Sequence, residues 1–450
     1  MAKAKKLAGT KEQKETSALM RTAREGDLEG LRRLAESGAD PRRPEERFSF
    51  TPLMAAAGLG RAECVAFLLP LSNPNHVSDL HFTALSDAVQ EPENNTGECV
   101  RMLMAASLPT PKTPTGKTLL MLAAESGHAE AVADILAHPE HRGDPRDLDN
   151  QQHDALAHAA WSGNAECVRL LLPVCDTEAR WATTLKANGE PGRRKRRANP
   201  LQIAAEQGHA ECVKALAAQF DAKERDAKGR TPLILAAMAG SLDAVETLLP
   251  LSDPQALDER GDNALMAAVS ASRRDTSLKH AAVVARLAGL CDTNRANEDG
   301  HWPLMNAAAN GEIECLRALI PFVDAKTPGA PADGRLSSMT ALMWAVRAGG
   351  PEAVEILAPI SDLAHKTITG HRAFDIGFQK RDRNPKNLDA LGPWMAEEDV
   401  RSVAEAEPNL DRFPRIKARR EALELASVVA NSEPESSSAG MAKKKLPKTL

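Results

Sequence analysis

The sequence predicts an all-α solenoid of about ten helix–turn–helix units, because a short phrase recurs along the chain. The phrase occupies Thr51–Ala57, Thr231–Ala237 and Thr340–Val346, each time with a threonine, a leucine two residues later and a run of mostly small or apolar residues. A glycine and a second phrase, such as Ala62–Val65, follow the first copy. The shortest period is about 32 to 33 residues, which is typical of stacked helical units that pack only on their neighbours.

The first phrase of each unit reads as a short helix. Its threonine suits the N-cap, where a side-chain oxygen accepts a backbone N–H, and the proline suits the first helical position. Glycines that favour a left-handed C-cap end this helix at Gly60, Gly127, Gly163, Gly208, Gly240 and Gly311. The leucine of the phrase, called the anchor leucine below, recurs as Leu53, Leu85, Leu120, Leu156, Leu201, Leu233, Leu265, Leu304 and Leu342, with Phe374 as a degenerate last member.

The second phrase reads as a second helix. It opens with Ala-Glu-Cys-Val at 62–65, 165–168 and 210–213, where the early glutamate suits the positive end of the helix dipole. Apolar residues then recur at helical spacing, as expected for a core-facing side. Proline cannot continue a helix, so we expect this helix to end at Pro70, Pro173, Pro250, Pro321 and Pro359.

Thr-Pro-Leu, Ala-Ala, Gly-His and Glu-Cys-Val recur in fixed order, and in this the chain resembles the ankyrin repeat family. The resemblance covers roughly residues 17–380 and implies helix pairs joined by hairpin-like loops, with the first helices lining a concave face. The family's Gly-Ala-Asp turn appears only at Gly38–Asp40. Other units carry Pro-x-Ser-Asp or a variant, as in Pro250–Asp253.

The repeat divides the chain into four segments. After the solenoid the period fails, so we expect a loop at 382–387, a short helix at 393–400 and an amphipathic helix at 414–430 that covers the open end of the stack. The expected segments are a disordered basic tail at 1–16, the solenoid at 17–380, a helical C-terminal cap at 381–430 and a disordered tail at 431–450.

Composition agrees with a repeat protein. The 450 residues include no tyrosine, and aromatic residues make up 3% of the chain, as small alanine-rich helix interfaces allow. The net charge of -5 gives no general attraction for nucleic acid. Met1–Lys6 lacks the apolar core of a signal peptide, and no stretch has the length of a transmembrane helix, so we expect a cytoplasmic protein, with delivery into a host cell left open.

Five of the seven cysteines occupy one repeat position, the third residue of the second phrase. Equivalent positions lie about one repeat apart along a stack, too far for most disulfides. We therefore expect buried, reduced thiols that act as small apolar side chains. The five are Cys64, Cys99, Cys167, Cys212 and Cys315.

Residues in which the repeats differ are the candidates for partner binding. The resemblance places the residue that lies five positions after the anchor leucine on the concave face. Tryptophan and arginine are frequent in binding hot spots. Trp344 lies three residues before Arg347, within reach on one helix. The candidates are Glu125, Trp161, Glu206, Met238, Trp344 and Arg347 on first helices, with Lys228, Arg230 and Arg260 at the loop tips.

Other chemistry has weaker support. The basic run Arg193, Arg194, Lys195, Arg196 and Arg197 favours either a solvated loop or a contact with phosphate or an import receptor. His138 and His141, with Asp144 and Asp147, have poor spacing for a metal site. We find no phosphate-binding loop or nucleophile motif, and predict no enzyme activity, metal or cofactor.

The sequence therefore favours a non-enzymatic, monomeric scaffold that binds a protein partner through the concave groove of the solenoid. The alternative is a bacterial or phage effector or regulator that engages host machinery, with residues 193–197 contributing targeting or phosphate contacts. The bacterial or phage setting rests on the bias towards alanine, arginine and proline. An enzyme with a site after residue 380 is a third class. The partner's identity does not follow from the fold.

Overall fold

The computed structural model describes residues 11–91, 97–175, 198–272, 277–326, 339–379, 384–407 and 409–432. Every regular element in these ranges is helical, which confirms the predicted all-α solenoid. The chain forms two compact units, residues 1–259 and 260–450. None of the described helices is both long and apolar enough to cross a membrane.

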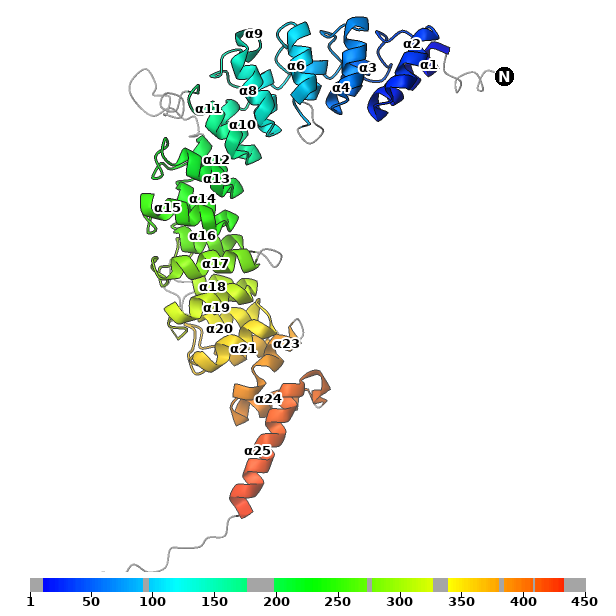
Figure 1. Ribbon diagram of the computed structural model, residues 1–450. Helices are drawn as coiled ribbons and strands as arrows, with labels where there is room; N and C mark the ends of the chain where they lie inside the picture. Colours follow the sequence, from blue (N-terminus) through cyan, green and yellow to red (C-terminus); the bar gives the residue numbers. More distant parts are fainter. Residues whose placement is uncertain are drawn as a thin grey trace, which may run out of the picture. The chain divides into compact units, whose positions relative to one another are not determined.

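The described residues of the first unit form seven helix pairs. The pairs follow one another in chain order (Figure 1). First helices pack on first helices, as α10 does on α7 and α12, and second helices pack on second helices, as α13 does on α11 and α15. The pairs are α1 (Lys11–Glu25) and α2 (Leu28–Glu36), α3 (Pro52–Gly58) and α4 (Ala62–Leu68), α5 (Ala84–Ala88) and α6 (Gly97–Ala106), α7 (Leu119–Glu125) and α8 (Ala129–Ala137), α10 (Ala155–Ser162) and α11 (Ala165–Leu171), α12 (Pro200–Gln207) and α13 (Ala210–Leu216), and α14 (Pro232–Ala239) and α15 (Leu242–Leu248), with the short α9 (Pro139–Arg142) after α8.

The second unit repeats this arrangement and then adds two helices. Its first helices pack in the order α16, α18, α20, α22, and its second helices in the order α17, α19, α21, α23. The pairs are α16 (Ala264–Ala271) and α17 (Ser277–Ala288), α18 (Pro303–Asn310) and α19 (Ile313–Leu319), α20 (Ala341–Arg347) and α21 (Pro351–Leu357), and α22 (Ala373–Gln379) and α23 (Pro385–Ala390), followed by α24 (Glu397–Ala406) and α25 (Pro414–Ser432).

The predicted helix signals act locally as expected. Thr51 accepts the backbone N–H of Met54 at 3.3 Å, and Thr231 and Thr340 cap α14 and α20 in the same way. Gly208 ends α12 with φ 77°, a conformation that a residue with a Cβ rarely adopts. The other predicted C-cap glycines, Gly60, Gly127, Gly163, Gly240 and Gly311, also have positive φ.

The second helices stop where proline predicts. The α-helix α4 ends at Leu68, and Pro70 lies in a 3₁₀ turn, Leu69–Leu71, that continues from it. Pro250, Pro321 and Pro359 occupy the same place after α15, α19 and α21. Proline thus fixes the length of the second helix in these units because it has no N–H to donate to the preceding turn.

In each unit the core lies between the first and second helices. Each anchor leucine is at most 5% exposed, and the small Ala-Ala pairs beside it, such as Ala159 and Ala160, are fully buried. Small side chains there let neighbouring first helices approach closely. Phe374 is the exception, because it is only partly buried and stacks on Phe378 with ring centroids 5.5 Å apart.

Loops between repeats form hairpin tips with one recurring pattern. In the tip before α14, Asp226 and Arg230 exchange two hydrogen bonds. The N–H of Asp226 donates to the carbonyl of Arg230 at 2.9 Å, and the Asp226 carboxylate accepts the N–H of Arg230 at 2.8 Å. Consecutive tips are also linked, since the N–H of Glu259 donates to the carbonyl of Lys228 at 3.0 Å. The same exchange joins Ser78 with Phe82, Thr113 with Lys117, Asp149 with His153, Asn297 with His301, and Thr367 with His371.

Three boundaries differ from the prediction. Helix α1 begins at Lys11, inside the segment expected to be a disordered tail, since Thr16 and Leu19 are buried and Glu12 pairs with Arg43. Part of the loop expected at 382–387 is helix α23, because Leu388 is fully buried in the packing of α23 on α21. The helix expected near 393–400 begins at Glu397, after a 3₁₀ turn at Gly392–Trp394.

The last helix is only partly packed. Ile416 is fully buried, and the carboxylate of Asp389 in α23 accepts the N–H of Arg415 at 2.9 Å, which attaches the start of α25 to the stack. Leu425, expected on the covering face, is 66% exposed. The prediction that this apolar face covers the stack is therefore wrong at Leu425.

Asp87 of α5 provides a test of pH-dependent stability. Burial raises the pKa of its carboxyl to about 8, and its buried Oδ2 atom has no hydrogen-bond partner among the described residues. The unfolded carboxyl loses its proton near pH 4, so between about pH 4 and 8 the folded state holds the proton and stability falls as pH rises. We expect Asp87→Asn to remove this decline and to raise the thermal midpoint at pH 8 by a few degrees. Parallel midpoint curves from pH 5 to 8 for both proteins would contradict this account of Asp87.

The five equivalent cysteines should be chemically inert in the folded protein. Burial raises the pKa of Cys167 to about 12, and burial also raises the pKa of Cys99 and Cys212 to about 11. Because the thiolate is the reactive form, we expect a thiol reagent at pH 8 to modify these residues only after unfolding in guanidinium. Mass spectrometry of the modified peptides checks each position, and rapid labelling of Cys167 in the folded chain is the opposing result.

Candidate functional site

The residues five after the anchor leucines form a row in the first unit. They lie at or near the last turn of α7, α10, α12 and α14, which pack in that order. Trp161 is the most exposed large apolar side chain on these four helices, at 55%, and Met238 follows at 36%. Glu206 is exposed and Glu125 half-buried. We call Glu125, Trp161, Glu206 and Met238 the first-helix row.

A charged network holds one end of this row. The Nζ atom of Lys117 lies 2.6 Å from both carboxylate oxygens of Glu125. The Oε1 atom of Glu125 lies 4.0 Å from Nδ1 of His158, one helix further along the stack. Lys117 belongs to a hairpin tip, so the network joins a tip to two first helices.

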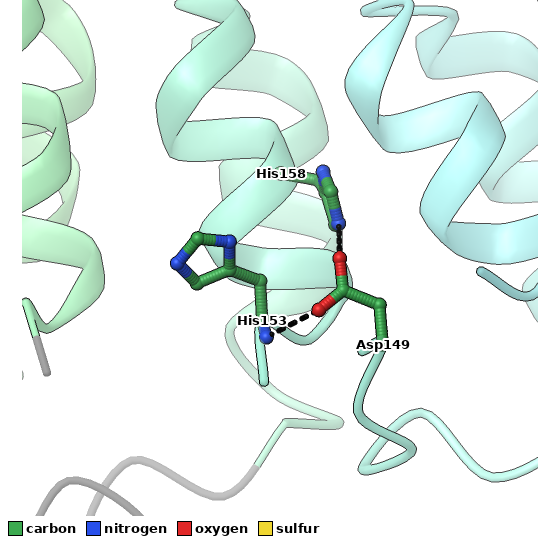
Figure 2. Close-up of side chains that lie close together, drawn as sticks. All are labelled: Asp149, His153 and His158. Carbon is green, nitrogen blue, oxygen red and sulfur yellow. Dashed lines mark hydrogen bonds and ion pairs between the residues drawn. The ribbon is translucent and has the colours of Figure 1, made fainter. Parts of the chain in front are cut away.

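His158 also contacts the hairpin tip before its own helix (Figure 2). Its Nε2 atom lies 3.0 Å from Oδ2 of Asp149, while the backbone N–H of His153 donates to Oδ1 at 2.8 Å. The imidazoles of His153 and His158 meet edge to face, with centroids 5.9 Å apart. His158 and Asp149 are buried, at 6% and 2% exposure, and His153 is half-buried.

Burial and hydrogen bonding set the protonation of this group. Burial lowers the pKa of His158, as does Lys117, and these effects outweigh Glu125 and Asp149. Burial pushes the pKa of Asp149 up, but hydrogen bonds from His153 and His158 outweigh it, so the pKa lies below its ordinary value. At neutral pH a neutral imidazole therefore faces a carboxylate.

A second network holds the other end of the row. Arg230 is bound by Asp226, with Nη2 2.6 Å from Oδ2, and reaches Glu206 at 3.3 Å. Its Nη1 atom lies 3.9 Å from the sulfur of Met238. The side chain of Arg230 is therefore held between two first helices, although the sequence predicted it as a loop-tip contact.

The second unit brings Trp344 and Arg347 together on α20. The guanidinium carbon of Arg347 lies 5.3 Å from the centroid of the Trp344 ring, a cation–π distance. His301, from the tip before α18, meets the same ring edge to face at 5.7 Å. Trp344 is half-buried and Arg347 is exposed, so the exposed guanidinium packs over a half-buried ring.

The other predicted residues have simpler surroundings. Lys228 and Arg260 are exposed on hairpin tips, where the backbone carbonyl of Arg260 accepts the N–H of Glu298 at 2.9 Å. The basic run 193–197 lies outside the described residues. His138 and His141 bind backbone carbonyls, of Asp134 at 2.7 Å and Met104 at 3.0 Å, so the structure does not gather them into a metal site.

Sequence analysis missed the grouping of Asp149, His153 and His158. Within the described ranges this is the only group of three or more His, Cys, Asp or Glu side chains close enough to share a metal ion. The sequence feature that could have indicated this group is His158. It lies two residues after its anchor leucine, where three other repeats have Leu122, Ile203 and Leu235. In those three repeats the position is apolar, and a histidine there requires a polar partner when buried.

Comparison with known proteins identifies the fold family. The family described as "Ankyrin repeats (3 copies)" matches residues 19–110, 92–180, 183–258, 201–279 and 276–368, which together make up more than half of the chain. No curated protein matches. Among solved structures, the crystal structure of the human ASB11 ankyrin repeat domain is 23% identical, with a TM-score of 0.41, and the match covers 52% of this chain and 96% of that one. The family match and the stacked helix pairs show that this chain belongs to the ankyrin repeat family.

Proposed function

We propose that this chain is a non-enzymatic scaffold that binds a protein partner through the first-helix surface of its repeats. Ankyrin repeats are generally protein–protein interaction modules. The single observation that carries the proposal is Trp161, a large ring 55% exposed in a row whose other members include the carboxylates Glu125 and Glu206. Exposed tryptophan is costly in water and is among the commonest hot-spot residues of interfaces.

The networks beside Trp161 support a preorganised surface. Lys117 and Arg230 are each bound to carboxylates before any partner arrives. Side chains fixed in this way lose little rotamer freedom on binding, which lowers the entropic cost of association. The partner of the first unit therefore needs an apolar side chain for Trp161, with polar or cationic groups beside it for the partly exposed Glu125 and Glu206.

The second unit offers a separate surface of different character. Arg347, supported by Trp344, presents a guanidinium that suits a carboxylate on a partner. Lys228 on a hairpin tip of the first unit and Arg260 on a hairpin tip of the second unit supply further charged contacts to a partner. Each unit contributes its own contacts to partner binding.

A role as a bacterial or phage effector or regulator is the second candidate, supported by the sequence of the basic run 193–197. Such a run binds phosphate or an import receptor by charge. Deletion of residues 190–198 is its test: unchanged cellular location together with unchanged salt-sensitive nucleic-acid binding would remove this role.

The scaffold proposal predicts the effect of Trp161→Ala combined with Arg347→Ala. Affinity capture from the native organism, followed by mass spectrometry, should identify partners of the wild-type chain that the double variant loses. A hot-spot truncation costs about 2 kcal/mol or more, so each substitution should weaken its purified complex by about 30-fold. The thermal midpoint should not change, because both side chains are exposed.

The matched control is Leu108→Ala combined with Leu278→Ala, which truncates two side chains that are 68% and 76% exposed and lie outside the first helices. This control should retain the same partners. Equal capture by wild type and by the Trp161 and Arg347 variant would exclude those residues from the binding surface.

A further inference from the structure

We infer that Asp149, His153 and His158 form a binding site for a divalent transition-metal ion, best suited to Zn²⁺, in the first unit. Two imidazoles and one carboxylate are a ligand set typical of zinc sites that keep a fourth position open for water or another donor. Imidazole also suits cobalt and nickel, which makes Co²⁺ a useful spectroscopic substitute.

The ligand atoms already lie near one point. The nitrogen and oxygen atoms offered by the three residues are all within 4.8 Å of one another. Ligands about 2.0–2.1 Å from zinc in a tetrahedron lie about 3.3 Å apart. The separation of 3.0 Å between Nε2 of His158 and Oδ2 of Asp149 is close to this value. Closure of the site therefore requires movement mainly of the half-buried His153 side chain.

The carboxylate of Asp149 is oriented by a hydrogen bond from behind, as metal ligands generally are. The backbone N–H of His153 occupies Oδ1 of Asp149, which leaves Oδ2 directed at His158 (Figure 2). Nδ1 of His158 faces the carboxylate of Glu125 at 4.0 Å. This separation is longer than a hydrogen bond, so Glu125 acts on the His158 ring through its charge.

The charges around the site favour a cation. Asp149 and Glu125 are the two carboxylates that face His158, and Lys117 is the one ammonium. Lys117 is bound to both oxygens of Glu125, so its charge is balanced, and the carboxylate of Asp149 remains to attract the ion. A bound divalent ion would therefore neutralise the charge of the buried Asp149 carboxylate, which no cationic side chain among the described residues neutralises.

Packing alone does not explain these three residues. In the tip before α14, Asp226 has the place of Asp149 and binds the guanidinium of Arg230, which has the place of His153. Here Asp149 is hydrogen-bonded by the backbone N–H of His153 and by Nε2 of His158, and His158 has the place of Leu235. This repeat therefore carries two histidines at places where the α14 repeat carries the arginine of a salt bridge and Leu235.

The test is titration of the untagged full chain, first stripped of metal, with ZnCl₂ in a calorimeter, and with CoCl₂ by visible absorption. We expect saturable Zn²⁺ binding and the intense bands of tetrahedral Co²⁺. His153→Ala should weaken Zn²⁺ binding more than tenfold, since even loss of a supporting residue costs about 10- to 100-fold. This variant keeps the hairpin, because His153 supports Asp149 through its backbone N–H.

Asp149→Asn is the second variant, and it keeps the fold for a reason visible in the chain itself. Asn297 has the equivalent place and accepts the N–H of His301 at 2.9 Å, so an amide satisfies the hairpin while it removes the carboxylate ligand. His138→Ala is the control, an exposed histidine outside the group. Three results would overturn the site. They are no Zn²⁺ binding by the wild-type chain, Zn²⁺ binding that is unchanged in both His153→Ala and Asp149→Asn, and a loss of Zn²⁺ binding in His138→Ala equal to that in the two variants.

Discussion

Each helix pair has an apolar side that only the next pair can bury, and the rest of the structure depends on this constraint. Anchor leucines such as Leu53 and Leu233 are fully buried, yet they belong to helices of seven or eight residues that would not be stable alone. Burial of a leucine or valine side chain contributes about 1.5–3 kcal/mol, and this contribution is available only in the stack. The Ala-Ala pairs and buried cysteines follow from the same need for close contact between neighbours.

The hairpin tips provide hydrogen-bond partners for backbone groups that lie outside the helices. Asp226, Asn297 and Thr113 differ in chemistry, but each accepts the N–H of the residue four positions later. This tolerance explains how the residue at this place varies between repeats while the tip keeps its hydrogen bonds. Any short side chain with an acceptor oxygen suffices, so the remaining side chains of the tip are available for other contacts.

The proposed partner-binding and metal-binding residues lie where equivalent positions of the repeats differ. Trp161 and Met238 occupy the place that Glu125 and Glu206 occupy in other repeats of the same unit, and His158 occupies the place that Leu122 and Ile203 occupy in the adjacent repeats. Such substitutions change the surface or the polar interior without changing the anchor leucines. A regular stack tolerates them because each one contacts only its own repeat and its neighbours.

The sequence by itself determined the helical solenoid, the start and end of most helices, and the burial of the cysteines. These features follow from local chemistry repeated many times: the Thr51 cap, the Gly208 C-cap and the Pro70 stop each act within one turn of helix. The sequence also paired Trp344 with Arg347, since three residues on a helix are neighbours.

Only the tertiary structure decided which residues from different repeats meet. Arg230 lies between Asp226 and Glu206, Lys117 holds Glu125 against His158, and Leu425 remains exposed although its spacing predicted burial. These outcomes depend on the rotation and spacing of successive pairs, which set distances between side chains far apart in sequence. Periodicity shows which face of a helix is apolar, whereas the packing of neighbouring helices determines what lies against it.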